Sequence, residues 1–213
     1  MKCVIIGAGG HGKVVLEILR AAKKHTPVGF VDADPSLAGK SMCGLPVFGN
    51  ANALGKLKAQ KVSAAIIAIG DNRARRSYSQ VLIQQGFKLV NAVHPRAIVS
   101  PSAKVGKGVV IAAGAVVGTE CQVGDLAIIN TSAVIDHECV IDEAAHICPT
   151  AALAGRVRVG ACAMVGLGAK ILPCLTIGVE AIVGAGTVVL HDLAAGVTAV
   201  GVPARVVKSV KAA

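Results

Sequence analysis

A six-residue period runs through the second half of the chain and restricts what that half can fold into. From residue 93 to residue 189, every sixth position holds Val, Ile or Leu, seventeen positions with no insertion. The fourth residue after each position is mostly small, being Ala or Cys in nine of the first ten cases. The repeated positions are Val93, Val99, Val105, Ile111, Val117, Val123, Ile129, Ile135, Ile141, Ile147, Leu153, Val159, Val165, Ile171, Ile177, Val183 and Val189.

This period predicts a three-sided parallel coil. The fourth position of one hexad and the first position of the next are two residues apart, so they share one face of a short strand of about three residues. The other three residues turn the chain at a corner. Three hexads then make a coil of 18 residues, and seventeen hexads make nearly six coils. The aromatic content of 2% agrees, because thin aliphatic layers fill such a coil.

The segment before the repeat has a strand–turn–helix pattern instead. The sequence "KCVIIGAGGHGKVVLEILRAAKK" predicts a strand, a glycine-rich turn and a helix. Gly7, Gly9 and Gly12 fit G-x-G-x-x-G between that strand and helix, where backbone N–H groups can bind phosphate. Two further strands, "VGFVDAD" and "AAIIAIG", are predicted to end at Asp32 and Gly70.

We therefore predict two domains. Residues 1–92 form an α/β Rossmann-like βαβ domain, and residues 93–213 form the solenoid with a C-terminal tail. About 90 residues make half of a dinucleotide fold, which suits one nucleotide and argues against an NAD-dependent oxidoreductase. His11 lies inside the glycine-rich loop, where packing gives an imidazole no evident purpose, so nucleotide binding is favoured over a purely structural βαβ unit.

Composition narrows the possible partners and the cellular compartment. The net charge of +10 comes from dispersed basic residues without stacking aromatics, which suits a soluble anion better than nucleic acid. Seven Cys with no CxxC pair argue against a disulfide framework and favour the cytoplasm. No apolar run is long enough to span or insert into a membrane, and no signal peptide is visible. Cys121 and Cys139 take the small inward position and are interpreted as hydrophobic residues.

Two histidines take outward places on the predicted coil. His137 and its neighbour Glu138 fall in a corner, whereas His146 falls in mid-strand, half a coil further on. A corner and the middle of the opposite side are about 15 Å apart, given a rise of roughly 3 Å per residue. The two rings therefore cannot meet within one chain, and they can meet only if solenoids pack side by side, as in a trimer.

Gly155 follows His137 by one coil of 18 residues and is expected to stack beside it at about 4.8 Å. The missing side chain leaves room for a thin ligand such as a pantetheine arm. An imidazole can act as general base in acetyl transfer from a thioester, and Glu138 can orient the ring. His146 or a neighbouring N–H can hold the carbonyl or the oxyanion. The alternative is that His137 and Glu138 are simply solvent-exposed corner residues without a catalytic function.

The chain as a whole resembles the bacterial sugar acyltransferases, in which an N-terminal nucleotide-sugar domain precedes a hexapeptide-repeat β-helix. The resemblance is carried by "GAGGHG", "FVDAD", "AIGDNRAR", "IINTSAVIDHECVI", "AHICPTAALAG" and "GVPARVV". It implies a left-handed coil, although the general rule for parallel crossovers predicts right-handed ones. The family includes N-acetyltransferases of UDP- or GDP-linked 4-amino sugars and relatives of the sialic acid O-acetyltransferases.

The resemblance also implies site residues and partners. It implies acetyl-CoA as co-substrate, a UDP-, GDP- or dTDP-linked 4-amino-4,6-dideoxy sugar as acceptor, a homotrimer and no metal. The implied catalytic residues are His137 and Glu138. The residues implied near acetyl-CoA are His146, Gly155, Leu167 and Gly184. The residues implied around the nucleotide are Gly9, Gly10, His11, Asp32 and Gly70.

Three other functions stay open. A sugar O-acetyltransferase would use the same base on a hydroxyl acceptor. A zinc lyase resembling the γ-type carbonic anhydrases would need about three converging histidines. His137 and His146 could supply two of them, while His94 and His191 lie at the ends of the solenoid. A non-catalytic trimeric scaffold that binds nucleotides would need none of these groups.

Overall fold

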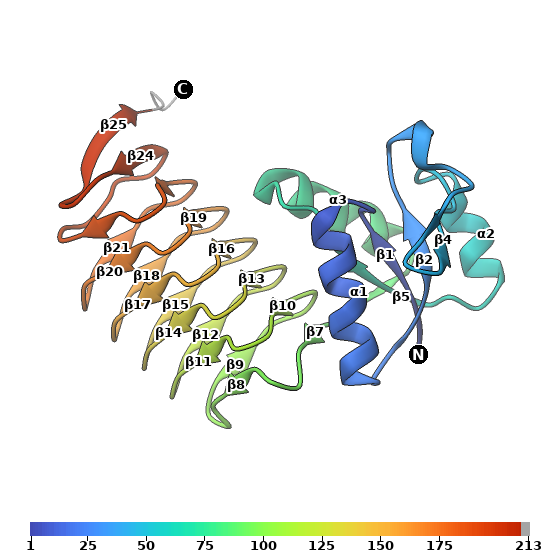
Figure 1. Cartoon of the computed structure of the whole chain (residues 1–213), viewed down its shortest axis with the longest axis horizontal. Coiled ribbons are helices and arrows are strands. Elements are labelled where there is room, and N and C mark those ends of the chain that lie inside the picture. The colour runs from blue at the N-terminus through green and yellow to red at the C-terminus, as the bar shows by residue number, and fades with distance from the viewer. Residues whose placement is uncertain (210–213) are drawn as a thin grey trace. The chain divides into compact units, whose positions relative to one another are not determined.

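A computed structural model describes residues 1–209 of the chain (Figure 1). It divides into two compact units, Met1–Pro95 and a solenoid that begins at Arg96. Strand β7 (Ala92–Val93) belongs to the first unit, where it packs against helix α1 (Gly10–Ala22). The boundary between residues 92 and 93 stays a prediction.

The first unit is a parallel sheet with strand order β2–β1–β5–β6 and helices between the strands. Its strands are β1 (Lys2–Ile6), β2 (Thr26–Val31), β3 (Ser41–Met42), β4 (Leu45–Pro46), β5 (Ala64–Ile67) and β6 (Lys88–Leu89). Its other helices are the 3₁₀ turn η1 (Pro35–Leu37), α2 (Ala53–Ala59) and α3 (Asn72–Gln84). The chain leaves β1 toward β2 on one side and later returns to β5 on the other. Their carboxyl ends therefore form the switch point at which open α/β sheets bind ligands.

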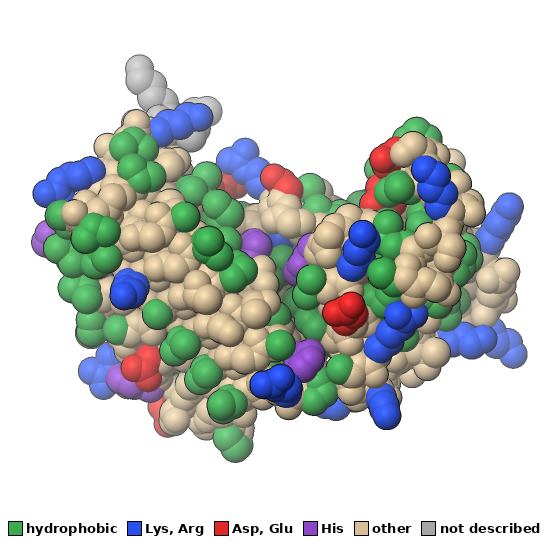
Figure 2. Space-filling model, in the orientation of Figure 1, with side chains coloured by type: hydrophobic (Ala, Val, Ile, Leu, Met, Phe, Trp, Pro, Cys, Tyr) green, Lys and Arg blue, Asp and Glu red, His purple; other side chains and the backbone are tan. Residues whose placement is uncertain are grey.

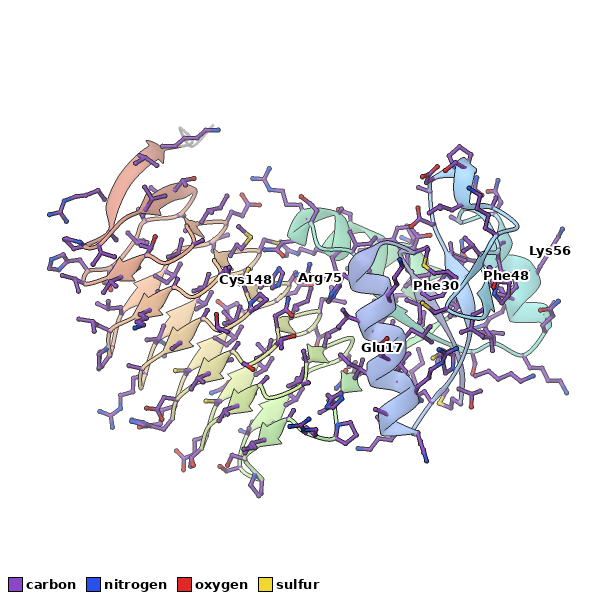
Figure 3. The ribbon with its side chains drawn as sticks, viewed as in Figure 1. Glu17, Phe30, Phe48, Lys56, Arg75 and Cys148 are labelled. Atoms are coloured by element: carbon purple, nitrogen blue, oxygen red, sulfur yellow. The ribbon has the colours of Figure 1, made fainter. Side chains whose placement is uncertain are left out.

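The local sequence explains why this sheet and its first helix form. Strand β1 is buried from Cys3 to Ile6, and the apolar positions of α1 recur at helical spacing toward the sheet. Phe30 is fully buried on β2, close to Gly12 at the start of the helix (Figure 3). The glycine-rich loop is thus fixed between a buried strand end and a packed helix.

The second unit is a parallel β-solenoid of about six coils with the left-handed sense of the hexapeptide class (Figure 1). Its three faces are named after the strand that each contributes to the central coil. The β16 face holds β10 (Val110–Ile111), β13 (Ile128–Ile129), β16 (His146–Ile147), β19 (Met164–Val165), β22 (Ile182–Val183), β24 (Val197–Val200) and β25 (Arg205–Ser209). The β14 face holds β8 (Ile98–Val99), β11 (Val116–Val117), β14 (Val134–Ile135), β17 (Ala152–Leu153), β20 (Lys170–Ile171) and β23 (Val188–Val189). The β15 face holds β9 (Lys104–Val105), β12 (Gln122–Val123), β15 (Val140–Ile141), β18 (Arg158–Val159) and β21 (Thr176–Ile177).

The hexad positions form the core of the solenoid. Every repeat position from Ile111 to Val189 is buried. Strands pair with a register of one coil, as Val116 with Val134, which confirms the 18-residue period. Each strand has two residues rather than about three, because the chain turns into the corner at once. The third corner residue is left-handed coil after coil, with φ of 58° at Glu138 and 62° at Arg156.

The cysteines predicted to point inward are packed in this core. Cys121 and Cys139 are both fully buried, which confirms their inward position. Burial raises the pKa of both thiols, that of Cys139 to about 11. The thiols are therefore protonated near neutral pH and behave as small apolar side chains.

Truncation of one core residue tests this packing. We expect Ile177→Ala to lower the free energy of unfolding by about 2–5 kcal/mol, because the lost methyl groups leave a cavity between coils. Ile177 is fully buried on β21, whereas Thr176 on the same strand is exposed. The control Thr176→Ala is expected to change that free energy by less than about 0.5 kcal/mol. Equal urea midpoints for the two variants would contradict the assigned strand register.

Candidate functional site

The corner between β14 and β15 carries the histidine–glutamate pair. The backbone N–H of His137 donates to the side chain of Asp136 at 2.8 Å, which shapes the turn. The N–H of Glu138 donates to the carbonyl of Thr119 in the preceding coil, at 2.8 Å. The carbonyl of His137 accepts from the N–H of Arg156 in the following coil, at 2.9 Å. The coils on both sides therefore hold the backbone of this corner in place.

The two side chains of the pair are in contact. His137 Nδ1 lies 2.9 Å from Glu138 Oε2, and the imidazole is half exposed. The hydrogen bond from His137, followed by that from Arg156, lowers the pKa of the Glu138 carboxyl. An ionised carboxylate only accepts hydrogen bonds, so the proton of a neutral ring lies on Nδ1. The lone pair on Nε2 is then free to accept a proton from a ligand.

Gly155 lies against the reactive edge of this ring. A Cβ atom added to Gly155 would overlap Cε1 and Nε2 of His137. The structure thus places Gly155 beside His137, one coil further on, as the period predicts. The absent side chain keeps the space next to Nε2 open.

Arg156 is a third member of this cluster that the sequence analysis missed. Its Nε donates to Glu138 Oε2 at 3.0 Å, the same oxygen that contacts His137. The 18-residue period was the available signal, because residue 156 is one coil after residue 138.

His146 lies on a different face of the solenoid, as predicted. It takes the outward position of β16, is half-buried, and its Nε2 lies 3.1 Å from Nδ2 of Asn130. The corner of His137 joins the other two faces, so one chain does not bring the two rings together. The contact with Asn130 was not foreseen, and the sequence repeat contains no clear signal for it.

Leu167 and Gly184 are in corners that follow strands of the β16 face. The Leu167 side chain is 56% exposed, which leaves it accessible to a ligand. A side chain at Gly184 would instead overlap Val200 of β24, so internal packing alone explains that glycine. Both residues lie on the His146 side of the chain and away from the His137 corner.

The glycine-rich loop contains glycines of two kinds. A Cβ atom on Gly7 or Gly12 would overlap a backbone carbonyl, so the fold itself requires these two glycines. A Cβ atom on Gly9, Gly10 or Gly70 would meet nothing within 4 Å. Packing therefore does not explain the second group, and the space beside its backbone is open to a ligand.

Asp32 connects the loop to the end of β2. Its carboxylate accepts from the N–H of Ala8 at 2.6 Å and from the N–H of Asp34 at 2.9 Å. Burial and the nearby charge of Asp32 raise the pKa of Tyr78 on α3. The carboxylate therefore holds the glycine-rich loop to the end of β2.

His11, in the first turn of α1, and Arg75, on α3, interact electrostatically. In the part of the chain that the structure describes, His11 Nε2 is buried without a hydrogen-bond partner. Burial and then the charge of Arg75 lower the pKa of His11 to about 4, so the ring is neutral near neutral pH. Arg75 is fully buried and donates to the carbonyls of Ile69 and Gly70 at 2.9 and 3.3 Å (Figure 3). These bonds fix the turn after β5, which ends at Ile67, three residues before the predicted end at Gly70.

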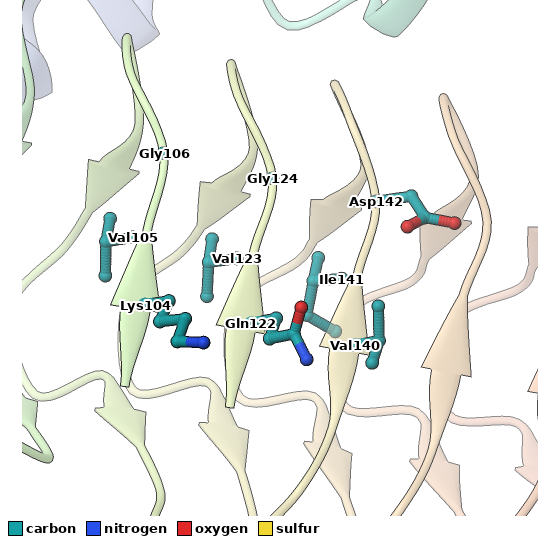
Figure 4. Close-up of a pocket in the computed structure, with 9 residues that line it drawn as sticks. All are labelled: Lys104, Val105, Gly106, Gln122, Val123, Gly124, Val140, Ile141 and Asp142. Carbon is teal, nitrogen blue, oxygen red and sulfur yellow. The ribbon is translucent and has the colours of Figure 1, made fainter. Parts of the chain in front are cut away.

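A shallow groove runs along the β15 face, over strands β9, β12 and β15 (Figure 4). None of the predicted site residues lines it. The lining residues are Lys104, Val105, Gly106, Gln122, Val123, Gly124, Val140, Ile141 and Asp142.

Residues 1–209 contain neither a metal-binding cluster nor a membrane-spanning helix. No cluster of three or more His, Cys, Asp or Glu side chains there could hold a metal ion. No helix in this range is both long enough and apolar enough to cross a membrane. On the face seen in Figure 2, Lys and Arg side chains are spread among hydrophobic and uncharged ones in both units.

Comparison with known proteins gives consistent relatives. Residues 2–82 match the family model of the PglD N-terminal domain. A histidine variant of perosamine N-acetyltransferase from Caulobacter crescentus, solved with CoA and GDP-perosamine, shares 47% identity over 98% of both chains, with a TM-score of 0.94. The acetyltransferase domain of PglB from Neisseria gonorrhoeae, solved with acetyl coenzyme A, shares 39% identity over 97% of this chain and 98% of that one, with a TM-score of 0.89.

A curated relative gives a shorter match. UDP-N-acetylbacillosamine N-acetyltransferase of Bacillus subtilis is 35% identical over 112 residues. The aligned part covers 51% of this chain and 50% of that relative, so the match spans about half of the relative's length. Together with the end-to-end structural matches, these findings mean that the chain belongs to the bacterial sugar acyltransferases, in which a nucleotide-sugar domain precedes a hexapeptide-repeat β-helix.

Proposed function

We propose that this protein transfers the acetyl group of acetyl-CoA to the amine of a nucleotide-linked amino sugar. The observation that carries the proposal is the His137–Glu138 pair, whose free ring nitrogen faces the gap at Gly155. Support comes from relatives of nearly the same length that are named as N-acetyltransferases or were solved with CoA and GDP-perosamine.

In this proposal His137 is the general base and Glu138 its partner. Glu138 accepts the Nδ1 proton and so holds the lone pair of Nε2 toward the amine. The amine nitrogen loses its proton to Nε2 while it bonds to the acetyl carbon. Acetyl-CoA supplies the thioester, whose C–S bond breaks, and the leaving thiolate takes the proton from Nε2 and departs as the thiol. The same base would serve a hydroxyl acceptor, which makes ester formation an outcome of the test.

We assign acetyl-CoA to a cleft between neighbouring solenoids of a homotrimer. His146, Gly155, Leu167 and Gly184 are its proposed contacts. In one chain Gly155 lies at the His137 corner, whereas the other three residues lie on the His146 side, so a second chain is needed to complete the site. The expected result of sedimentation analysis is an active trimer, and a fully active monomer would contradict this arrangement. Seven free cysteines support a cytoplasmic location.

The nucleotide is assigned to the switch point of the first unit. Gly9, Gly10 and Gly70 leave open space beside the backbone, and Asp32 and the neutral His11 supply polar atoms. The start of α1 has no side-chain cap, so its first N–H groups can bind phosphate.

An alanine substitution tests this assignment. We expect Gly10→Ala to raise KM for the nucleotide sugar by about tenfold, because the new methyl group occupies the space for phosphate. The KM for acetyl-CoA should stay unchanged in steady-state kinetics. Gly55 on α2 has the same open surroundings and serves as control, since Gly55→Ala should alter neither constant. Equal kinetics for both variants would move the nucleotide elsewhere.

A panel of acceptors tests the function as a whole. Thiol release from acetyl-CoA is measured with GDP-, UDP- and dTDP-linked 4-amino-4,6-dideoxy sugars, and with matched sugars that carry a hydroxyl in place of the amine. We expect release only with amino sugars, with an amide in the product by mass spectrometry. Release only with the hydroxyl sugars, or with none, would contradict N-acetyl transfer.

A further inference from the structure

Arg156 contacts both members of the His137–Glu138 pair from the next coil. Its backbone N–H donates to the His137 carbonyl at 2.9 Å, and its Nε donates to Glu138 Oε2 at 3.0 Å. The oxygen that accepts from Arg156 is also the oxygen 2.9 Å from His137 Nδ1. One carboxylate oxygen thus links the imidazole and the guanidinium.

This shared oxygen has a geometric consequence. A glutamate side chain at a half-exposed corner has several rotamers, and only some of them point a carboxylate oxygen at Nδ1. The guanidinium binds the same carboxylate oxygen as the ring and so restricts these rotamers. Arg156 itself is braced by its backbone bond to the same corner, so it does not depend on a distant element.

The shared oxygen also has an electrostatic consequence. The guanidinium helps to keep the carboxylate ionised, because its hydrogen bond, after that of His137, lowers the pKa of the Glu138 carboxyl. The other charged groups near the corner are Asp136, whose Oδ1 accepts from the His137 backbone, Glu120 one coil before Glu138, and Arg158 on β18. The exposed thiol of Cys174 follows one coil after Arg156.

We propose that Arg156 is a positioning residue for the general base, holding Glu138 in line with Nδ1 of His137. This role rests on the proposed acetyl transfer, but the contacts that define it are independent of the acceptor. We call this pair of hydrogen bonds, from the Arg156 guanidinium to the Glu138 carboxylate and from there to the His137 imidazole, the relay. All three residues lie at the same corner of two successive coils.

Histidine titration by NMR tests the relay without any substrate. The full chain is labelled at its histidines, and the His137 signal is assigned with His137→Asn. In Glu138→Gln we expect the titration midpoint of His137 to move down by about 0.5–1 pH unit, because a contacting carboxylate is lost. In an Arg156→Ala background the same substitution should move the midpoint by less than about 0.2 pH unit, because the carboxylate is no longer held at Nδ1. An Arg156→Lys background keeps a cation beside Glu138 and should restore most of the shift caused by Glu138→Gln.

Arg158→Ala is the matched control. It removes the same charge from an outward position two residues further along, where the side chain is exposed on the β15 face. In an Arg158→Ala background Glu138→Gln should move the midpoint as far as it does in the otherwise wild-type chain, because Arg156 still holds the carboxylate. An equally large shift from Glu138→Gln in the Arg156→Ala background would overturn the relay.

Kinetics then separate this proposal from the proposed function. Arg156→Ala should lower kcat by about tenfold, with the KM of both substrates unchanged, because orientation of the base is lost while binding is retained. In a Glu138→Gln background the same substitution should have no further effect on kcat. An undiminished loss in that background would show that Arg156 acts elsewhere and would overturn the relay. If the midpoint shift from Glu138→Gln depends on Arg156 in a protein without acetyl transfer, the relay is upheld and the proposed function is rejected.

Discussion

His137→Asn is expected to lower kcat by a factor of about 10²–10⁴, the usual contribution of a general base. Asparagine retains a polar side chain but cannot accept the proton of the acceptor amine. The KM of both substrates should change little, because the half-exposed ring is placed to react rather than to bind. Thiol release under saturating substrates measures the effect.

His191→Asn controls for the loss of an imidazole at a corner. His191 occupies the same corner row as His137, three coils further on, and is exposed. This variant should retain wild-type kcat. A decrease of less than tenfold in His137→Asn, or an equal decrease in the control, would remove His137 from the reaction.

Gly155→Ala has the second-largest expected effect, a decrease in kcat of about 10², the cost that small displacements of catalytic groups can reach. The added methyl group overlaps Cε1 and Nε2 of His137, so the ring must rotate away from Glu138 or from the ligand. The backbone of Gly155 needs no left-handed angle, and the ring can swing into solvent. The melting temperature should therefore stay close to that of the wild type.

A double-mutant cycle identifies the cause of this loss. If the methyl group acts by displacing the ring, then Gly155→Ala in a His137→Asn background should cause little further decrease. Additive losses would mean that Gly155 matters for acetyl-CoA alone, and near-wild-type kcat in Gly155→Ala would mean that the ring does not act where the structure places it.

The architecture of the solenoid could be predicted because every hexad packs in the same way. One aliphatic residue per hexad fills the interior, so the positions from Ile111 to Val189 define faces, corners and an 18-residue register. Handedness could not be derived in this way, because the general rule for crossovers favours the opposite sense, and only the family resemblance supplied it. Each strand has two residues, fewer than the period alone predicts, because a left-handed corner residue turns the chain early.

The period predicts those contacts of the candidate site that join residues one coil apart. His137 and Gly155 are in contact because they are one coil apart. The same 18-residue spacing predicts that Arg156 lies beside Glu138.

In the first unit no period connects distant residues, so contacts depend on tertiary packing. The sequence placed Asp32 at a strand end but could not show that its carboxylate binds the loop through Ala8. Likewise, nothing local indicates that Arg75 is fully buried and turns toward the carbonyls that follow β5.

The most direct test of the central claim is a structure of the His137→Asn variant with CoA and a nucleotide-linked amino sugar bound. The amine is expected within about 2.6–3.2 Å of the place that Nε2 occupies in the wild type, with the CoA sulfur beside Gly155. An amine bound at another corner, or a sulfur on a face remote from Gly155, would contradict the account.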